Sequence, residues 1–417
     1  MSKSNTNPKN LGIESSKEFS IDDDSRDPFA EPETAENIFS KTYRNTGSFA
    51  FNGKGRFSRV GRDPSEEQKN IKERNSYRSG SPDRFEDRYP SLELQKNIGL
   101  RNPKNDCFMN ASLQVMFSIP ELMKFFATKE YKNVYSFEEC NKKKAYSSKE
   151  MILPGYKYCN AMSKLCLDVC SSFKKELEAT ELRKLFKKSF SKSHQHDAND
   201  FILSLFSKLQ DEQTLKKRPV SDKFANEQEA WEHYVKHNPS IIDQLFFGMI
   251  QRSSRCGSCK KVAHRYESFN QIELECESSS LEMAYQGFLS DEIMKKNQSY
   301  RCDECHKVVK CRIMKEIVKM PRYLFFLFKR FNSNMSKITK MIKYRTKILL
   351  EDKIDGGPLE YHLQGIILHS ESRRGGHYIS YAKKGDNWIR FNDASYKPIK
   401  SKHIIDKDAY ILLYKRA

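Results

Sequence analysis

The sequence lacks any long hydrophobic run. None of its 417 residues belongs to an apolar stretch near the roughly 20 residues that a membrane-spanning helix requires, so we expect no membrane association. The N-terminal segment MSKSNTNPKNLGIESSKEF has no hydrophobic signal-peptide region, which argues against secretion. We therefore expect the protein in the cytoplasm, the nucleus or both.

Hydrophobic residues are scarce overall, at 37% of the chain, so we expect part of the chain to stay outside any core. Residues 1–95 contain neither cysteine nor tryptophan, and their aromatic residues follow no helical or strand period. We predict a disordered basic N-terminal tail over 1–95. The less favoured alternative is an arm that binds RNA or another partner through Lys54, Arg56, Arg59 and Arg62.

The charge and the cysteine count narrow the class of protein only a little. Lys plus Arg number 74 and Asp plus Glu 55, which gives a net charge of +19. This surplus allows nucleic acid as a partner without identifying one. Eleven cysteines, an odd number, favour metal ligation and a reactive thiol over a framework of disulfides.

From about residue 96 the sequence shows the periods of packed helices and then of strands. A helix is predicted to start at Cys107, capped by Asn105 or Asp106. Further helices are predicted at 160–175, at 180–188 and after Asp197. Strands follow at 244–251, 323–331, 361–369, 377–383, 388–391 and 410–414. Helices first and strands later indicate an α+β fold.

Two CxxC pairs predict a zinc site, Cys256-Gly-Ser-Cys259 and Cys302-Asp-Glu-Cys305. A two-residue gap lets both thiolates of a pair bind one tetrahedral ion, and four thiolates close its coordination sphere. We therefore predict a structural Zn²⁺, with each pair at the turn of a hairpin and the residues between them looped out. Two alternatives stay open: four unrelated buried thiols, or substitution of a ligand by His264, His306 or Cys311.

Cys107 is a candidate nucleophile because backbone N–H groups at a helix N-terminus stabilise a thiolate. His377, which follows two glycines at the start of a predicted strand, is a candidate base. Asn392 and Asp393 follow on the next strand and could orient its imidazole. A cysteine at a helix start is more often a packed apolar residue, so residue types alone leave this pair open.

Six segments in order resemble the ubiquitin-specific proteases, a family of deubiquitinating cysteine proteases. The similar segments span about 97–416: a Cys box at 99–114, a Q-x-D-A-x-E-F helix at 195–201, the CxxC pairs, a strand ending in L-K-R-F at 323–331, a His box at 376–393 and a closing strand at 409–414. The resemblance implies a papain-like right hand over 96–417. Its parts would be a helical thumb at about 96–235, zinc-ribbon fingers at about 240–320 and a β palm at about 321–417.

The resemblance also implies roles for single residues. Cys107 would attack the bond at the C-terminal glycine of ubiquitin and form an acyl-enzyme, with His377 as general base and Asn392 as the third triad residue. Asp393 is the acid that follows, and Asn102 matches the residue that stabilises the oxyanion. The implied substrate-binding residues are Gln195, Asp197, His369, Gly376 and Tyr378. For Asp197, capping of the following helix is an equal alternative.

The sequence departs from the family pattern before the nucleophile. Lys104 and Asp106 stand where the family usually has Gly and Thr, and Glu371 replaces a usual Gly. A carboxylate at 106 would raise the pKa of the adjacent thiol unless Lys104 compensates. The alternatives to an active deubiquitinase are therefore a weak or inactive ubiquitin-binding scaffold and a basic zinc-ribbon protein that binds nucleic acid. The combination of Cys107, His377 and Asn392 favours the enzyme, with ubiquitin and ubiquitinated proteins as partners.

Overall fold

The computed structural model describes residues 96–133, 155–214, 223–293, 299–331, 336–372 and 375–417. The predicted tail at 1–95 lies outside these residues. The described part consists of a helical region, a large sheet and a smaller sheet, which confirms the predicted α+β fold. None of the described helices is long and apolar enough to cross a membrane.

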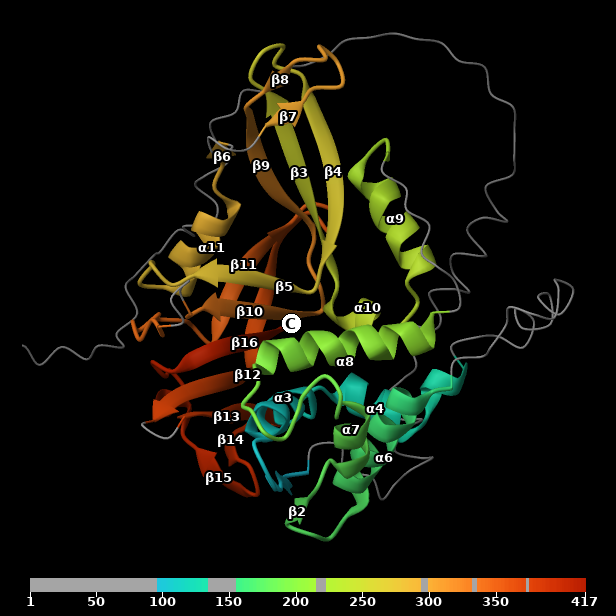
Figure 1. Ribbon diagram of the computed structural model, residues 1–417, viewed down its shortest axis with the longest axis vertical. Helices are drawn as coiled ribbons and strands as arrows, with labels where there is room; N and C mark the ends of the chain where they lie inside the picture. The colour runs from blue at the N-terminus through green and yellow to red at the C-terminus, as the bar shows by residue number, and fades with distance from the viewer. Residues whose placement is uncertain (1–95, 134–154, 215–222, 294–298, 332–335, 373–374) are drawn as a thin grey trace, which may run out of the picture. The chain divides into compact units, whose positions relative to one another are not determined.

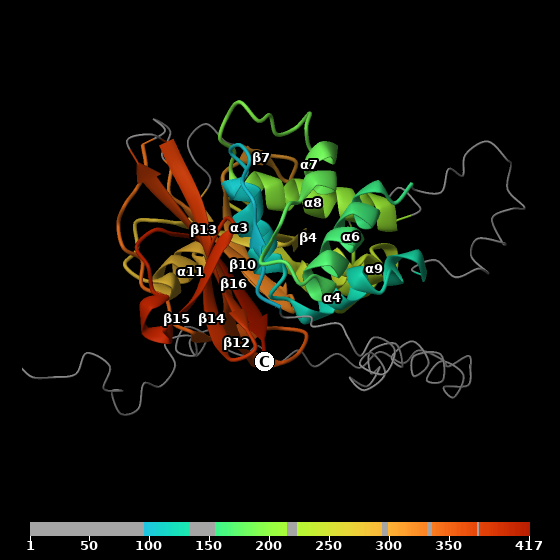
Figure 2. The same ribbon diagram turned by 90° about the horizontal axis from the view of Figure 1, so that it is seen from below.

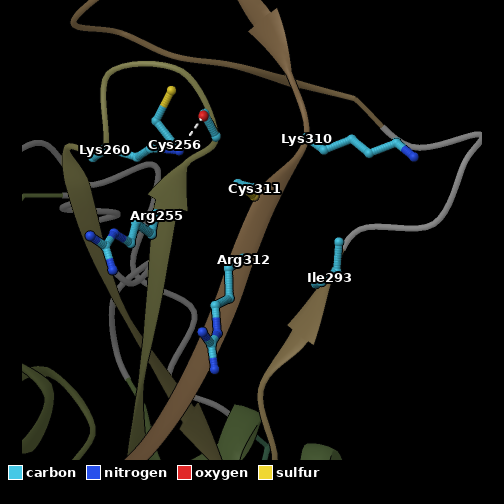
Figure 3. Close-up of a pocket in the computed structure, with 8 residues that line it drawn as sticks. Arg255, Cys256, Lys260, Ile293, Lys310, Cys311 and Arg312 are labelled. Atoms are coloured by element: carbon cyan, nitrogen blue, oxygen red, sulfur yellow. Dashed lines mark hydrogen bonds between the residues drawn. The ribbon is translucent and has the colours of Figure 1, made fainter.

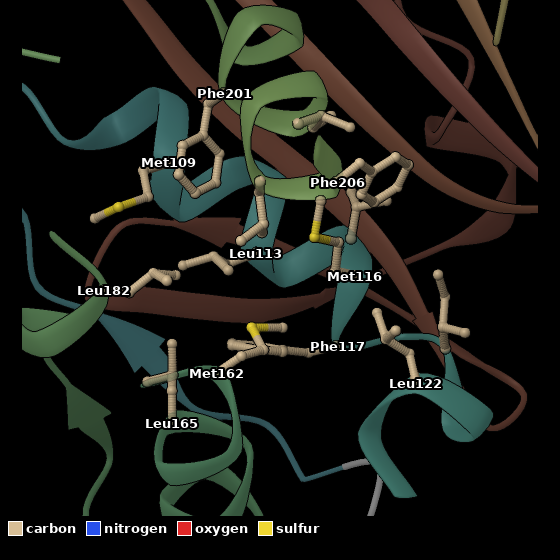
Figure 4. Packing of buried hydrophobic residues seen from close by; sticks show 14 of the residues in the cluster. Met109, Leu113, Met116, Phe117, Leu122, Met162, Leu165, Leu182, Phe201 and Phe206 are labelled. Atoms are coloured by element: carbon tan, nitrogen blue, oxygen red, sulfur yellow. The ribbon is translucent and has the colours of Figure 1, made fainter. Parts of the chain in front are cut away.

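The helical region, which we call the thumb, is built from five helices around one apolar core (Figures 2 and 4). They are α3 (Cys107–Met116), α4 (Pro120–Ala127), α6 (Lys157–Ser171), α7 (Thr180–Leu185) and α8 (Ala198–Gln213), with the short η3 (Glu130–Asn133) after α4. In α8, Phe201 and Phe206 are buried and project into the core, as the i, i+3, i+4, i+7 spacing predicts. The predicted helices at 160–175 and 180–188 correspond to α6 and α7 and end a few residues earlier than expected.

The palm is an eight-stranded sheet, ordered β15-β14-β13-β12-β16-β10-β5 with β11 paired to β12 (Figure 1). Its strands are β5 (Gln271–Glu275), β10 (Tyr323–Lys329), β11 (Lys347–Asp352), β12 (Gly357–Ser372), β13 (Gly375–Lys384), β14 (Asn387–Asn392), β15 (Ser395–Ile399) and β16 (Ala409–Arg416); η4 (Ser401–His403) precedes β16. Six of the seven residues of β10 are buried, which explains its continuous apolar sequence. Five predicted strands are confirmed here.

The fingers are a second sheet, ordered β4-β3-β9-β6, with a two-stranded hairpin at its far end (Figure 1). They comprise β3 (Gly248–Cys256), β4 (Val262–Phe269), β6 (Glu292–Ile293), β9 (Cys311–Lys319) and the hairpin β7 (Tyr300–Arg301) and β8 (Val308–Val309). Helix α9 (Glu227–His237) packs on β4, and α11 (Leu281–Leu289) packs on β5 and β9. The range 240–320 assigned to the fingers therefore also contains β5, which pairs in parallel with β10 of the palm.

The predicted strand at 244–251 is wrong in its first half. Residues Ile241–Phe246 form the helix α10, and only Gly248 begins the strand β3. The Ser240 side chain caps this helix by accepting a hydrogen bond from the Asp243 N–H, and the Phe246 ring lies 4.6 Å from that of Phe206. A cap and a core contact thus favour a helical turn where the apolar run alone suggested a strand.

Two short strands connect the start of the described chain to the site. β1 (Gly99–Leu100) pairs in parallel with β2 (Glu176–Leu177), and the Leu100 N–H donates to the Asp393 carbonyl oxygen. A Cβ atom at Gly99 would lie 2.0 Å from the Ala394 carbonyl oxygen, so this approach requires glycine. Residues 99–101 are thereby held against the turn that follows β14.

Candidate active site

Helix α3 packs between strand β13 and helix α8 (Figure 2). Cys107 begins α3, and His377 lies on β13. Cys107 is the first residue of α3 and is 5% exposed, while the His377 side chain is 38% exposed. The Cys107 thiol is the largest cause of the raised pKa of His377, so the two groups lie within range of each other. The two residues that the sequence proposed as nucleophile and base are therefore neighbours.

Asn392 orients the imidazole from the neighbouring strand. The His377 Nε2 atom lies 2.7 Å from Asn392 Oδ1 and 4.0 Å from Asp393 Oδ2. Since Nε2 is used in this way, Nδ1 is the ring nitrogen left for Cys107. The contact with Cys107, and after it the hydrogen bond with Asn392, raises the pKa of His377 to about 9 against the opposing effect of burial.

Asp393 connects the imidazole to the loop before the nucleophile. It adopts φ +50°, a conformation that Asp tolerates better than most residues. Its Oδ2 atom accepts a hydrogen bond from Asn102 Nδ2 at 3.0 Å, and its Oδ1 atom accepts one from Asn110 Nδ2 at 2.8 Å. The carboxylate is thus held by two side-chain amides, with the imidazole 4.0 Å away.

Asn102, the predicted oxyanion donor, has a fixed side-chain orientation. Its Oδ1 atom accepts the Asp106 N–H at 2.8 Å, so Nδ2 must point the other way, toward Asp393. An amide nitrogen carries two hydrogens, and the bond to Asp393 uses one of them. The second N–H can donate a hydrogen bond to an oxygen that gains negative charge beside Cys107.

Asn110 is a site residue that the sequence did not reveal as one. It is buried one helical turn after Cys107, and its Nδ2 atom also lies near the carbonyl oxygens of Leu100 and Arg101, at 3.1 and 3.2 Å. Its position in an otherwise apolar stripe was the available signal, since a buried amide needs polar partners. Those partners come from β1 and from Asp393, which cannot be identified without the fold.

The expectation for Asp106 requires two corrections. Asp106 occupies the N-cap position of α3, but its side chain caps no backbone N–H. It forms instead a buried ion pair with Arg183 of α7, with Oδ1 and Nε 2.5 Å apart. Burial raises the pKa of Asp106, and Arg183 opposes that shift. Arg183, and not the exposed Lys104, therefore compensates the charge beside the thiol.

The substitution of the usual Gly at position 104 causes no backbone strain. The left-handed conformation in this loop belongs to Asn105, at φ +54°, and asparagine is one of the residues that tolerate it. The Asn105 side chain also donates to the Lys192 carbonyl oxygen at 3.1 Å. The loop before Cys107 is therefore compatible with the residues present.

Gln195 joins the thumb to the strand that carries His377. Its Nε2 atom donates to the Gly376 carbonyl oxygen at 2.6 Å, and its Oε1 atom accepts the Gly376 N–H at 2.9 Å. A Cβ atom at Gly376 would lie 2.2 Å from His369 Nε2, so a side chain there would displace His369. The His369 ring in turn packs against Tyr378, with centroids 4.4 Å apart. These four predicted substrate-binding residues form one continuous group.

Asp197 is committed to contacts within the protein. Its Oδ1 atom accepts the N–H groups of Asn199 and Asp200, at 2.6 and 3.4 Å, and so caps α8. Its Oδ2 atom accepts the hydroxyls of Tyr378 and Tyr410, at 3.2 and 2.7 Å. Asp197 therefore caps α8, as one of the two interpretations of the sequence predicted. Tyr410 is a partner that the sequence did not suggest. Both carboxylate oxygens already hold donors.

The four predicted zinc ligands converge between two turns. Cys256 ends β3 and Cys259 lies in the β3–β4 turn, while Cys302 and Cys305 lie in the β7–β8 turn. All four Sγ atoms are within 4.8 Å of one another. The Cys256–Cys305 and Cys259–Cys302 Sγ distances are 3.9 and 3.6 Å. Four sulfurs bound at about 2.3 Å to a tetrahedral ion would stand about 3.8 Å apart, so the geometry fits zinc.

The alternative ligands lie outside this group. His264 Nδ1 is engaged with Gln251 and Ser253, at 2.9 and 2.8 Å, and neither Cys311 nor His306 belongs to the four-sulfur cluster. Within the described residues it is the one such cluster of metal-binding side chains. A zinc ion held there would tie the two hairpins together and leave no open coordination position for catalysis. The residues looped out between the pairs form β4, β5, α11 and β6.

Comparisons with known proteins agree with this architecture. Relatives include the probable ubiquitin carboxyl-terminal hydrolase 16 of Schizosaccharomyces pombe, 26% identical over 332 residues that cover 76% of this chain and 66% of the relative. Another is ubiquitin carboxyl-terminal hydrolase Usp2 of Drosophila melanogaster, 25% identical over 343 residues that cover 76% of this chain and 34% of the relative. The chain thus matches between a third and two thirds of the length of these proteins.

Solved structures give the same result for the fold. Ubp8 in the SAGA DUB module with Sgf11, Sus1 and Sgf73, bound to monoubiquitin, matches with a TM-score of 0.61 and 20% identity over 78% of this chain and 71% of that one. The same module bound to ubiquitin aldehyde matches with a TM-score of 0.58 and 21% identity, at the same coverage. The family model described as ubiquitin carboxyl-terminal hydrolase matches residues 98–414. The chain therefore belongs to the ubiquitin carboxyl-terminal hydrolase family, and within it to the ubiquitin-specific protease type.

Proposed function

We propose that the protein is a deubiquitinase that hydrolyses the isopeptide or peptide bond at the C-terminal glycine of ubiquitin. The observation that supports this most is the series Cys107–His377–Asn392, in which the thiol neighbours the imidazole and the imidazole is hydrogen-bonded to the amide, and which joins helix α3 to strands β13 and β14. Mere binding of ubiquitin requires none of these three residues. Ubiquitin is proposed as the partner because the matched Ubp8 structures carry it.

The proposed reaction begins with the Cys107 thiolate. Its sulfur attacks the carbonyl carbon of the terminal glycine, and a C–S bond forms as the carbonyl oxygen gains negative charge. The second N–H of Asn102 and the backbone N–H groups at the start of α3 would stabilise this oxyanion, an interaction that is worth about 3 kcal/mol in other enzymes. Asp393 contributes by holding Asn102 in the required orientation.

His377 transfers the protons in both halves of the reaction. As the imidazolium it donates a proton to the departing lysine amine, and the C–N bond breaks to leave the acyl-enzyme. As the neutral imidazole it then accepts a proton from water, whose oxygen attacks the acyl carbon; the C–S bond breaks, which releases the carboxylate of ubiquitin and restores the Cys107 thiolate and the imidazolium. Asn392 keeps the ring in the orientation that presents Nδ1 to the sulfur. Asn110 acts indirectly, because its side-chain amide holds the Asp393 carboxylate in place.

The test is turnover of ubiquitin that carries a C-terminal fluorogenic amide. We expect the unchanged protein to release the fluorophore, and Cys107→Ala to abolish release while still binding ubiquitin. Cys276→Ala is the matched control, because it removes a buried thiol outside the site and should retain turnover. If the unchanged protein binds ubiquitin without turnover, the scaffold alternative holds and the proposal fails.

A further inference from the structure

A cationic hollow of about 420 Å³ lies at the end of the fingers, beside the zinc ligands (Figure 3). Four basic side chains line it: Arg255, Lys260, Lys310 and Arg312. They come from the end of β3, from the β3–β4 turn, and from the chain that enters β9. Neither the hydrolytic mechanism nor the zinc cluster uses any of them.

The sheet register concentrates positive charge in this hollow. Arg255 of β3 is the direct cross-strand partner of Arg312 of β9, so both side chains project from the same face. Like charges directly opposite each other destabilise a sheet. Asp291 lies 2.5 Å from Arg312, but both side chains of that ion pair are more than a third exposed, so water screens it. A bound anion would relieve the repulsion that remains.

The walls of the hollow are fixed before any ligand arrives. The Gly257 N–H donates to the Lys310 carbonyl oxygen at 3.1 Å, which ties the β3–β4 turn to the start of β9. Lys260 Nζ donates to the Gly257 carbonyl oxygen at 2.6 Å. Cys256, a proposed zinc ligand, and Cys311 face each other across the β3–β9 ladder. A rigid site loses little conformational entropy when a partner binds.

The rim adds an apolar element, because Ile293 on β6 is 74% exposed beside the four cations. We propose that this hollow docks an acidic peptide segment of a partner protein, with carboxylates against the arginines and an aliphatic side chain against Ile293. Carboxylates fit the planar arginine fork. Single-stranded nucleic acid is less well matched, since sites for it use aromatic side chains to stack on the bases.

The test is direct binding of labelled peptides to the full, zinc-loaded chain, so its outcome does not depend on catalysis. The probe is a ten-residue peptide of glutamates with two leucines, compared with its Glu→Gln and Leu→Ser counterparts and with a ten-nucleotide oligothymidylate. We expect saturable binding of the acidic, leucine-containing peptide that weakens as salt is added. We expect the Gln peptide not to bind and the Ser peptide to bind more weakly.

Charge reversals in the protein locate the site. Arg255→Glu and Lys310→Glu should each weaken binding by roughly tenfold or more, whereas Lys402→Glu, an exposed lysine on η4, should leave it unchanged. Ile293→Ser should weaken binding of the leucine peptide but not of its Ser counterpart. Arg255→Glu places a carboxylate opposite Arg312, so the melting temperature should be retained or raised, which separates lost binding from misfolding.

Three outcomes would overturn the proposal. The first is no saturable binding of the acidic peptide. The second is an equal loss of affinity in Arg255→Glu and in Lys402→Glu, which would mean unspecific attraction to a basic protein. The third is tighter binding of oligothymidylate that Arg255→Glu abolishes, which would assign the hollow to nucleic acid.

Discussion

The active site and the fingers are stabilised in different ways. The active site lies in a region of buried side chains, where polar groups from residues 102–110 meet His377 and residues 392–393. In the fingers, by contrast, none of the eight residues of β4 is buried, and the apolar cluster beneath α9 has three buried members, Ala230, Met249 and Val318. The paired Ile250 and Ile317 of β3 and β9 are also buried. The active site is stabilised by packing between distant parts of the chain. The fingers bury too little apolar surface to be stabilised in the same way.

This contrast indicates which interaction each region depends on. The active site should tolerate the loss of the metal but not the loss of a buried polar partner. The fingers should tolerate many side-chain changes but not the loss of a thiolate, since two turns with little core beneath them need another link.

Removal of zinc should have the largest effect and should be confined to the fingers. Structural zinc sites contribute on the order of 10 kcal/mol of binding free energy, so Cys302→Ser or chelation should unfold β3, β4 and β9 locally. Hydrogen exchange should show these strands losing protection while α3, α8 and β13 keep theirs. Cys311→Ser, outside the four-sulfur cluster, should keep both zinc and protection. Unchanged protection of β3 and β4 after chelation would contradict the comparison.

Replacement of Lys384 should have the next largest effect on stability. This residue lies in the region that is stabilised by long-range packing. It is buried at the end of β13, and its Nζ atom donates to the Phe117 carbonyl oxygen, 2.5 Å away, at the end of α3. Burial lowers the pKa of Lys384 to about 7, against an opposing effect of the thiols of Cys170 and Cys166. In the unfolded chain the pKa is about 10.4. Between about pH 7 and pH 10 the unfolded state therefore binds one more proton at Lys384 than the folded state, so the contribution of Lys384 to stability rises with pH across this window. His377, with its raised pKa, contributes in the opposite sense up to about pH 9.

At about 1.4 kcal/mol per pH unit, the gain across the window approaches 4 kcal/mol. Lys384→Met should abolish this gain and be more stable than the unchanged protein at pH 7. Lys383→Met, at the half-buried neighbouring position, should leave the pH dependence as it was. Denaturant unfolding at pH 7 and pH 9.5 measures all three proteins. A difference in stability between the unchanged protein and Lys384→Met that stays the same at both pH values would mean that Lys384 is charged when folded.

The same contrast explains which features were predictable from the sequence. Features set by local spacing were predictable: these are the CxxC pairs, the start of α3 at Cys107 and the apolar stripe of α8. Features set by distant partners were not, apart from the grouping of Cys107, His377 and Asn392, for which residue types were too weak and the family resemblance was needed. Arg183 is the partner of Asp106 and lies 77 residues away, and β5 joins the palm through pairing with β10. The helix α10 was missed because an apolar run outweighed the Ser240 cap, although that cap is visible in the sequence.

Asn110→Leu should test the buried polar network around Asp393 with a smaller effect. The change removes the amide that holds Asp393 Oδ1 and so loosens both Asn102 and the surroundings of His377. Loss of such a supporting contact typically costs 10–100-fold, so we expect kcat to fall by about that factor with little change in KM. Steady-state kinetics on the fluorogenic ubiquitin substrate measures both constants.

Gln114→Leu provides the matched control for Asn110→Leu. Gln114 is also a buried amide of α3 and also donates to a carbonyl oxygen before the site, that of Ile98 at 2.7 Å, but it does not contact Asp393. Both variants should lose stability, because each leaves a buried carbonyl oxygen with fewer donors. Only Asn110→Leu should lose kcat. Equal losses of kcat in the two would show that the role of Asn110 is general support of the helix.

Substitutions beside His377 should have the smallest effect, a shift in the pH dependence of turnover. The size of each shift identifies which neighbour sets the pKa of His377. Contact with Cys107 and the hydrogen bond to Asn392 raise the pKa of His377 to about 9, and Asp393 adds a smaller contribution. The imidazolium that protonates the leaving amine is present below that pH and is lost as the pH rises through it, so kcat/KM should fall tenfold per unit above about pH 9. Asn392→Ala should move this falling limb to lower pH, and Asp393→Asn should move it less. The exposed Asn387→Ala should not move it. A larger shift in Asp393→Asn would mean that the carboxylate 4.0 Å from Nε2, and not the amide at 2.7 Å, sets the charge of the imidazole.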